Sequence, residues 1–258
     1  MTIPAISIRD VTMDYPTPDG VNHVLDHVSY DVAEGHFVSI VGPSGVGKTT
    51  LLRLLTGLAS PTGGEIHVRG ERLSSSPEGL AVVLQDYTRS LMPWLTVAKN
   101  ISLPLRRAKM SRSAVQERVQ ESLAEVGLTG TERSYPWQLS GGMQQRASIC
   151  RALIHEPRML LLDEPFGALD AFTREELWNV LRDLWTEQRF NVILVTHDLR
   201  EAAYLADTVY VMSKRPGRIL ARREIDLPRP RDLDITYTDR FTALVHELRS
   251  RIGEIRKS

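Results

Sequence analysis

The stretch Gly42-Pro-Ser-Gly-Val-Gly-Lys-Thr-Thr50 limits the fold of this chain more than any other feature. Its pattern is glycine, four residues, then Gly-Lys-Thr, with an apolar strand before it and a helix after it. Glycines let the backbone turn so that its N–H groups point at phosphate oxygens, and the helix adds the positive end of its dipole. A glycine turn without a ligand needs neither the lysine nor the threonine. The stretch therefore predicts a phosphate-binding loop.

The residues of this loop have distinct expected roles. We expect Lys48 to reach the β- and γ-phosphates of a nucleotide, and the Thr49 hydroxyl to hold Mg²⁺. The predicted nucleotide contacts are the loop and the first helical residues: Gly42, Pro43, Ser44, Gly45, Val46, Gly47, Lys48, Thr49 and Thr50.

A second motif, Met159-Leu-Leu-Leu-Asp-Glu-Pro165, puts two acidic residues after a buried apolar strand. Parallel sheets present ligands at the carboxyl ends of their strands. Asp163 suits the coordination shell of Mg²⁺, and Glu164 is placed to orient or deprotonate an attacking water. An acidic pair alone can simply cap the next segment. Combined with the phosphate-binding loop, it predicts nucleotide hydrolysis.

A third motif, Leu139-Ser-Gly-Gly-Met-Gln-Gln145, opens a predicted helix. Glycine costs about 1 kcal/mol relative to alanine in a helix interior, so two at its start need a reason. An N-cap at Ser140 explains the serine. It does not explain Gly141 and Gly142.

Along the chain the third motif lies between the other two, and the three motifs resemble those of ABC-type ATPases, which have them in that order. By that resemblance, Leu139–Gln145 is the family's signature, and four further positions take the family's roles. They are Gln85 for the glutamine loop, Gly167-Ala-Leu-Asp170 for the D-loop, His197 for the switch histidine and Tyr15 for the aromatic residue that stacks on adenine. Structural alternatives exist for three of them: Tyr15 as a buried strand aromatic, Gln85 as a polar strand-end residue and His197 as a structural histidine.

The resemblance also implies a mechanism. Two copies pair head to tail, and the signature of one faces the phosphate-binding loop of the other across ATP. Ser140, Gly141 and Gly142 then point at the γ-phosphate, where side chains would block the approach of the anion. Glu164, His197 and Gln85 are the expected catalytic residues, with Gln85 as a ligand of Mg²⁺ or of the water. Asp170 is expected to act across the dimer.

Three classes of ABC ATPase compete for this chain. A DNA-repair or chromosome type needs a long coiled coil between loop and signature, and a translation type carries two cassettes. The chain has neither, and its 32 basic and 32 acidic residues give no pull toward nucleic acid. The amino-acid sequences of three segments are similar to those of the nitrate/sulfonate/taurine import group: 85–97, 165–178 and 212–219. The resemblance implies the ATPase subunit of a bacterial importer, with permease subunits and, indirectly, a solute-binding protein as partners.

The predicted fold is α/β, of the P-loop NTPase type. Strands and helices alternate over 159–212, which favours a mainly parallel sheet covered on both faces. The first third reads as strands and turns, an antiparallel β subdomain, and an α-helical subdomain is inserted at about 90–157. We expect a nucleotide-binding domain over 1–227 and a C-terminal helical extension over 228–258. Ser113–Gln116 and Thr173–Glu176 have the form of capping boxes.

Cellular location follows from weaker signals. The chain has one cysteine, no signal-peptide pattern, and no apolar run near the roughly 20 residues that cross a bilayer. We therefore expect a peripheral protein on the cytoplasmic face of the membrane. The loop after Gln85 gathers apolar residues; by the resemblance it lines a groove that receives a short cytoplasmic helix of the permease, and packing under the helical subdomain is the alternative. They are Tyr87, Leu91, Met92, Trp94 and Leu95.

Overall fold

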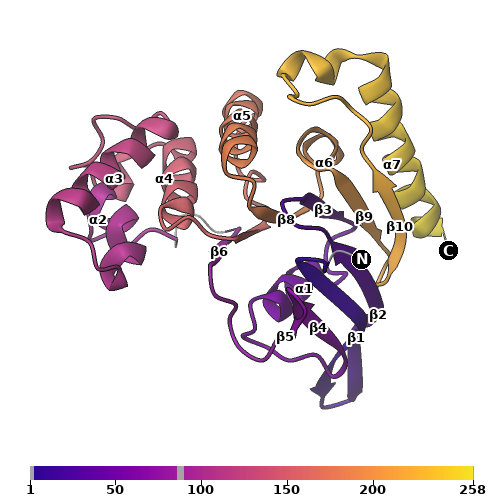
Figure 1. Ribbon diagram of the computed structural model, residues 1–258. Helices are drawn as coiled ribbons and strands as arrows, with labels where there is room; N and C mark the ends of the chain where they lie inside the picture. Colours follow the sequence, from indigo (N-terminus) through magenta and orange to yellow (C-terminus); the bar gives the residue numbers. More distant parts are fainter. Residues whose placement is uncertain (1–2, 86–89, 258) are drawn as a thin grey trace. The chain divides into compact units, whose positions relative to one another are not determined.

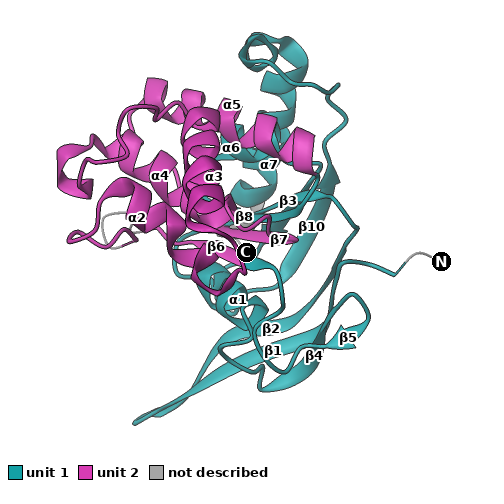
Figure 2. Ribbon diagram, turned by 60° about the vertical axis from the view of Figure 1, so that its left-hand side comes forward, with its two compact units in different colours: residues 1–80, 189–258 teal, residues 81–188 magenta. Residues whose placement is uncertain are grey.

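The structure is a computed structural model and describes residues 3–85 and 90–257. The chain divides into two units (Figure 2). The first consists of residues 1–80 and 189–258, and the second of residues 81–188.

The first unit begins with an antiparallel sheet, as the sequence predicts. Strand β1 (Ile6–Thr17) pairs with β2 (Gly20–Val32) through a hairpin and with β4 (Gly63–Val68), and β5 (Glu71–Arg72) forms the edge. Ile6 and Ile8 are fully buried, whereas later residues of β1 alternate or are exposed. This mixed pattern is typical of antiparallel strands with one solvated side.

The same unit holds four strands in the order β10-β9-β3-β8 (Figure 1). β3 (Phe37–Val41) is parallel to both β8 (Asn191–Thr196) and β9 (Thr208–Met212), and β10 (Ile219–Glu224) runs antiparallel to β9. Every residue of β3, β8 and β9 is buried, as expected for parallel strands covered on both faces. The helices of this unit are α1 (Lys48–Leu55), α6 (Leu199–Leu205) and α7 (Asp239–Lys257).

The second unit contains most of the helices. Its strands β6 (Leu80–Val83) and β7 (Met159–Asp163) are neighbours in a sheet. Helices α2 (Val97–Ser102), α3 (Arg112–Glu125) and α4 (Gly141–Leu153) pack on one another, and α5 (Ala171–Gln188) packs on α4 (Figure 1). Short 3₁₀ turns occupy 103–107 and 136–138. Between α2 and α4 the described chain has no strand, as the sequence predicts.

Both predicted capping boxes were wrong. Helix α3 is capped by Ser111, whose Oγ accepts from the N–H of Ala114 at 3.2 Å, and not by Ser113. Helix α5 begins at Ala171, and Asp170 Oδ1 accepts from the N–H of Thr173 at 3.1 Å. In each case a suitable polar side chain two or three residues upstream reaches the free N–H groups first.

The C-terminal extension is joined to α6 by a buried arginine. Arg231 is 1% exposed, and its Nη1 donates to the carbonyls of Tyr204 at 2.9 Å and Ala206 at 2.7 Å. Tyr204 lies in the last turn of α6 and Ala206 is its C-cap, the part of a helix where carbonyls take donors from outside the helix. The Tyr204 hydroxyl donates to the Arg231 carbonyl at 3.0 Å. Burial lowers the pKa of Arg231 to about 10, so the group stays charged at neutral pH.

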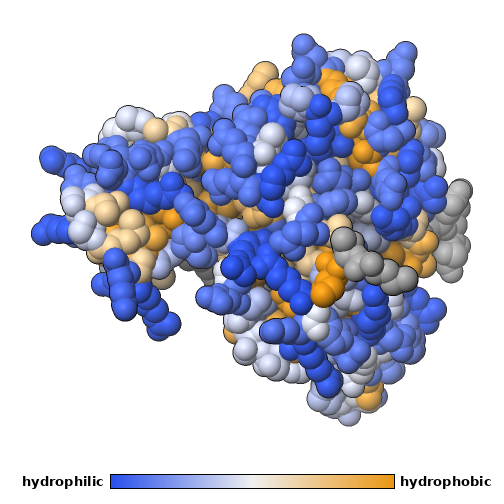
Figure 3. All heavy atoms as spheres, in the orientation of Figure 1, coloured by the Kyte–Doolittle hydropathy of each residue, from blue (hydrophilic) through white to orange (hydrophobic). Residues whose placement is uncertain are grey.

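The surface is mostly hydrophilic on the face drawn in Figure 3, with hydrophobic residues in small groups. No helix among the described residues is both long enough and apolar enough to span a membrane.

Candidate nucleotide-binding site

The predicted phosphate-binding loop has backbone conformations that suit glycine. Gly45 and Gly47 have φ of 78° and 104°, in the left-handed region. A Cβ on Gly47 would also lie 2.8 Å from Leu25 Cδ2 and 3.0 Å from the Val24 carbonyl. Strand β2 therefore presses against the last glycine of the loop. Glycine is required there by both conformation and space.

The Lys48 side chain folds back onto the backbone of this loop. It is buried, and its Nζ donates to the carbonyls of Gly42 and Pro43, each at 2.9 Å. Helix α1 has no acidic residue in its first turn, so the positive end of its dipole is not neutralised. Thr49 is exposed beside it. A buried ammonium, a helix N-terminus and an exposed hydroxyl form a set that suits a phosphate chain.

His197 leaves the sheet beside the loop. Val41, the last residue of β3, pairs with Thr196, the last residue of β8, and the strands are parallel. Gly42 and His197 are the next residues of each strand, so both lie at the same sheet edge. Asp198 then starts α6, since its Oδ1 accepts from the N–H groups of Arg200 at 2.8 Å and Glu201 at 3.2 Å.

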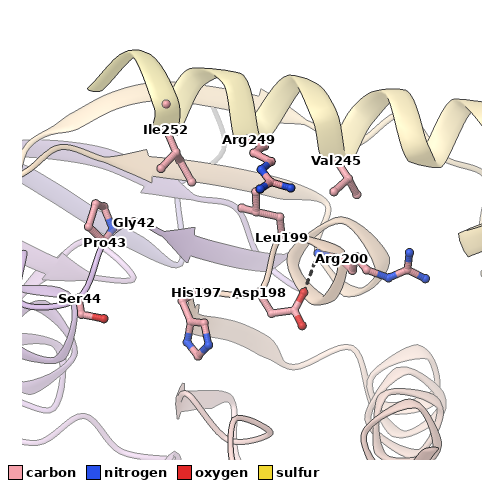
Figure 4. A pocket seen from close by; sticks show the side chains of 11 residues that line it. Gly42, Pro43, Ser44, His197, Asp198, Leu199, Arg200, Val245, Arg249 and Ile252 are labelled. Carbon is pink, nitrogen blue, oxygen red and sulfur yellow. Dashed lines mark hydrogen bonds between the residues drawn. The ribbon is translucent and has the colours of Figure 1, made fainter. Parts of the chain in front are cut away.

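A cavity of about 640 Å³ adjoins these two turns (Figure 4). Gly42, Pro43 and Ser44 line one side of it, and His197 with the start of α6 lines another. Helix α7 lines a further side. The C-terminal extension therefore reaches the edge of the predicted nucleotide site.

Tyr15 lies near the end of β1 and is partly exposed. It pairs with Asn22 on β2, and Met13, two residues earlier, pairs with Leu25, the residue that meets Gly47. Tyr15 is thus on the strand pair that abuts the loop, and it is not a buried strand aromatic.

The acidic pair lies in the second unit. Asp163 is buried at the end of β7, and Glu164 follows with a φ of 44°. Left-handed backbone at a residue other than glycine is costly and is concentrated at functional sites. Gln85, two residues beyond β6, donates through Nε2 to Glu164 Oε2 at 3.4 Å. The structure thus brings together two of the three predicted catalytic side chains.

Ser140 is the N-cap of the signature helix α4, the role that the sequence indicates for the serine. Ser140 Oγ accepts from the N–H of Met143 at 3.3 Å. A Cβ on Gly142 would lie 2.3 Å from Thr173 Cγ2, so this glycine is needed where α4 meets α5. The space required by Thr173 is a reason for Gly142 that the sequence does not reveal.

Asp170 is linked to the signature helix through the same threonine. Thr173 Oγ1 donates to Asp170 Oδ2 at 2.7 Å, and the Thr173 N–H donates to Oδ1. These bonds lower the pKa of Asp170, an exposed carboxyl, so the group stays ionised. Sequence reasoning assigned Thr173 to a capping box and missed its bonds to Asp170; the only signal for them was its place three residues after the aspartate.

Comparisons with known proteins agree with this geometry. The sequence profile of the ABC transporter family matches residues 25–167. The chain belongs to the ABC transporter family. It is 42% identical over 226 residues to the aliphatic sulfonates import ATP-binding protein SsuB of Bacillus cereus, a match that covers 88% of each chain.

Solved structures place the chain among the ATP-binding cassettes. A dimeric post-hydrolysis state of the cassette MJ0796, bound to ADP and Pi, has a TM-score of 0.75 and 31% identity over 86% of this chain and all of that chain. CbiO1 of Clostridium perfringens, part of the complex cbiONQ, matches 99% of both chains with a TM-score of 0.78, and at 24% identity it shows the fold alone. This ABC cassette binds ATP and is an ATPase. The predicted family and fold are confirmed.

The apolar residues of the loop after Gln85 differ in their burial. Leu91 is 1% exposed and belongs to the core, so packing explains it. Trp94 is 71% exposed and Met92 is partly exposed. Tyr87 lies outside the described residues. The Arg151 guanidinium of α4 donates to the Ser90 carbonyl and fixes the start of the described loop to the signature helix.

Proposed function

We propose that this cassette is the ATP-hydrolysing subunit of a bacterial importer for a small anion of the nitrate, sulfonate and taurine class. The observation that carries the proposal is the identity to a sulfonate import ATP-binding protein over 88% of both chains. Sulfonates are therefore the first solutes to test. Because the cassette itself is not expected to touch the solute, the test needs the assembled transporter.

Hydrolysis is assigned to residues of both units. Lys48 binds the β- and γ-phosphates, and the backbone of Gly42–Gly47 surrounds them. Glu164 orients and deprotonates the attacking water, and Gln85 holds the Glu164 carboxylate through the 3.4 Å hydrogen bond. His197 contacts the γ-phosphate from the sheet edge that it shares with the loop. Tyr15 stacks on the adenine.

Mg²⁺ fits the oxygen donors of this cassette. Thr49 supplies an exposed hydroxyl, Asp163 a carboxylate at a strand end, and Gln85 an amide oxygen. The described residues contain no cluster of three acidic, histidine or cysteine side chains that could hold a metal alone. Mg²⁺ commonly takes one or two protein oxygens and completes its shell with phosphates and water. When bound, it neutralises the charge that develops on the phosphates.

We further propose that two copies close head to tail around ATP. Ser140, Gly141 and Gly142 of one copy then bind the γ-phosphate held by Lys48 of the other, and Asp170 acts across the same interface. The support is the N-capped start of α4 and the solved dimer of a relative. In mixed dimers of Lys48→Ala and Gly141→Asp copies, one site carries both defects and the other neither. Recovery of hydrolysis on mixing supports shared sites, and no recovery from two inactive parents contradicts them.

Permease subunits are the proposed partners, and they hold the cassette at the cytoplasmic face of the membrane. Trp94 and Met92 are proposed to contact a cytoplasmic segment of the permease. Trp94→Ser should leave the basal ATPase intact, weaken assembly with the permease and lower transport. Leu220→Ser, at an exposed position on β10, is the control. Normal assembly of the Trp94 variant would remove that loop from the interface.

The central test of the function is reconstitution in proteoliposomes with the permease and the solute-binding protein. We expect ATPase stimulation by a binding protein loaded with an aliphatic sulfonate. Stimulation by nitrate, and by no sulfonate, would exclude sulfonates as the solute. No response to any permease would instead favour a non-transport ABC ATPase of the DNA-repair or translation type.

Glu164→Gln tests the assignment of the base. Losing a general base costs about 10²–10⁴-fold in rate, whereas ATP binding and ATP-dependent dimerisation should persist. Glu187→Gln, an exposed glutamate at the end of α5, is the matched control. Near-normal hydrolysis by the Glu164 variant would assign the base to another residue.

A further inference from the structure

The cavity beside the phosphate-binding loop is built partly by the C-terminal helix. Val245, Arg249 and Ile252 project from one side of α7 toward Leu199 and the turn at His197 (Figure 4). Their spacing of four and three residues puts them on one helical face. None of them is needed for phosphate chemistry. This face therefore needs another explanation.

The side chains of the cavity favour an aromatic ring together with a separate carboxylate close to it. Pro43, Leu199, Val245 and Ile252 supply apolar surface, and Arg249 supplies a positive charge. Asp198 is the one acid in the lining, against which Arg200 and Arg249 supply two positive charges.

Arg200 also lines the cavity, and its side chain already contacts an aromatic ring. Its guanidinium lies 5.6 Å from the centroid of the Phe241 ring. Guanidinium groups stack on aromatic faces and gain more when the site is desolvated. Within the described part of the chain, neither Arg200 nor Arg249 forms an ion pair with a carboxylate.

A matching group stands on the second unit. Phe172 is 80% exposed, the most exposed of the chain's described phenylalanines. It follows the predicted D-loop by two residues, in the first turn of α5. Asp170, an ionised carboxyl, lies two residues before it in the chain. This short segment thus offers the aromatic ring and the negative charge that the cavity lacks.

We propose that the cavity between α7 and the phosphate-binding loop receives Phe172 of a second copy when the two copies close around ATP. The inference rests on the proposed head-to-tail dimer. In that dimer, Gly42–Ser44 and His197 face the partner, and the cavity is continuous with this surface. Helix α7 then becomes part of the closed interface. The C-terminal extension would thus respond to ATP through a contact with the partner copy.

Site-directed crosslinking tests the contact. One copy carries Phe172→Cys and the other Val245→Cys, both with Glu164→Gln so that ATP holds the dimer closed. The native Cys150 does not compete, because its thiol is buried and burial raises its pKa to about 12. Ser250→Cys, exposed on another face of α7, is the matched control for Val245→Cys. A short bismaleimide is added with and without ATP, and products are separated by size.

We expect crosslinked dimers with Phe172→Cys and Val245→Cys only when ATP is present, and few with the Ser250→Cys control. If ATP produces a dimer by size-exclusion chromatography but the two cysteine pairs crosslink equally, the Phe172 contact is overturned while the proposed function stands. If ATP produces no dimer, the head-to-tail model and this inference both fail. Crosslinking of Val245→Cys to the permease in the assembled transporter, in place of the partner copy, would overturn the contact and identify a different occupant.

A binding measurement gives a second readout that does not depend on cysteine geometry. In the proposed closed dimer the Phe172 ring is buried. Removing it should weaken ATP-dependent dimerisation of the Glu164→Gln protein by about tenfold or more. Phe172→Ala should show this loss, and Phe172→Tyr should retain most of the affinity. ATP binding by the monomer should be the same in both variants. Unchanged dimerisation of Phe172→Ala would overturn the contact.

Discussion

Replacing Gly142 by alanine should disable the signature helix through packing. The new Cβ would lie 2.3 Å from Thr173 Cγ2, whereas carbon atoms in contact are normally about 3.5–4.0 Å apart. Helices α4 and α5 must therefore separate, or Thr173 must rotate. Rotation would take its hydroxyl from Asp170 Oδ2, which it reaches at 2.7 Å. Either response moves the signature or the D-loop.

The size of the effect follows from these contacts. Overpacking typically costs about 1–3 kcal/mol. For a chain of this length each kcal/mol lowers the melting temperature by about 2–4 °C, so we expect a loss of several degrees for Gly142→Ala. A displacement near 1 Å in an active site can lower the rate by about 10²-fold. Thermal unfolding and steady-state ATP hydrolysis measure the two effects.

A second substitution separates packing from anion access. Thr173→Ser removes Cγ2 and keeps the hydroxyl for Asp170. The next atoms of Thr173 lie 3.6 Å and 3.8 Å from the position that the alanine Cβ takes, an ordinary contact. The double variant Gly142→Ala with Thr173→Ser should recover stability and most of the ATPase. If it recovers stability but stays inactive, the alanine blocks the phosphate instead. A Gly142→Ala protein with normal stability and activity would refute the packing argument.

Three further predictions concern other contacts. Lys48→Ala should abolish measurable ATP binding by equilibrium dialysis without unfolding the chain, and retained binding would remove Lys48 from the phosphate site. Arg231→Ala should lose about 2–6 kcal/mol in urea unfolding, because the buried carbonyls of Tyr204 and Ala206 lose the donor that Arg231 supplies. Arg229→Ala, at a half-buried ion pair with Asp207, should lose clearly less. Thr173→Val should raise the pKa of Asp170 toward its ordinary value. Because the pKa of Asp170 is depressed in the folded protein, the variant should be less stable than wild type near neutral pH, and this difference should vanish as the pH falls through the folded pKa. A difference in stability that persists in acid would contradict this.

The fold was predictable because its motifs carry physical requirements. The Gly-Lys-Thr pattern requires a strand, a tight loop and a helix, and the structure has β3, the loop and α1 in that order. The apolar runs of β7 and β8 were long enough to mark buried strands. Helix starts were harder, because Ser111 and Asp170 competed with Ser113 and Thr173 for the same N–H groups.

Contacts between distant segments were beyond sequence reasoning. Nothing local shows that Thr173 leaves no room for a side chain on Gly142, or that Gln85 reaches Glu164. Arg231 resembles an exposed charge in a proline-rich stretch, yet it is among the most buried large side chains of the protein. Charge and hydropathy patterns describe average environments, and a buried arginine that binds carbonyls is an exception to them.

The left-handed backbone at Glu164 implies a trade between stability and turnover at this position. Glycine adopts a φ of 44° without the steric cost that a Cβ imposes, whereas glutamate must be held in that conformation by its surroundings. Glu164→Gly would relieve that cost and also remove the carboxylate. Selection for folding alone would favour glycine here. A glutamate at such a point marks a place where the chain gives up stability to aim a functional group.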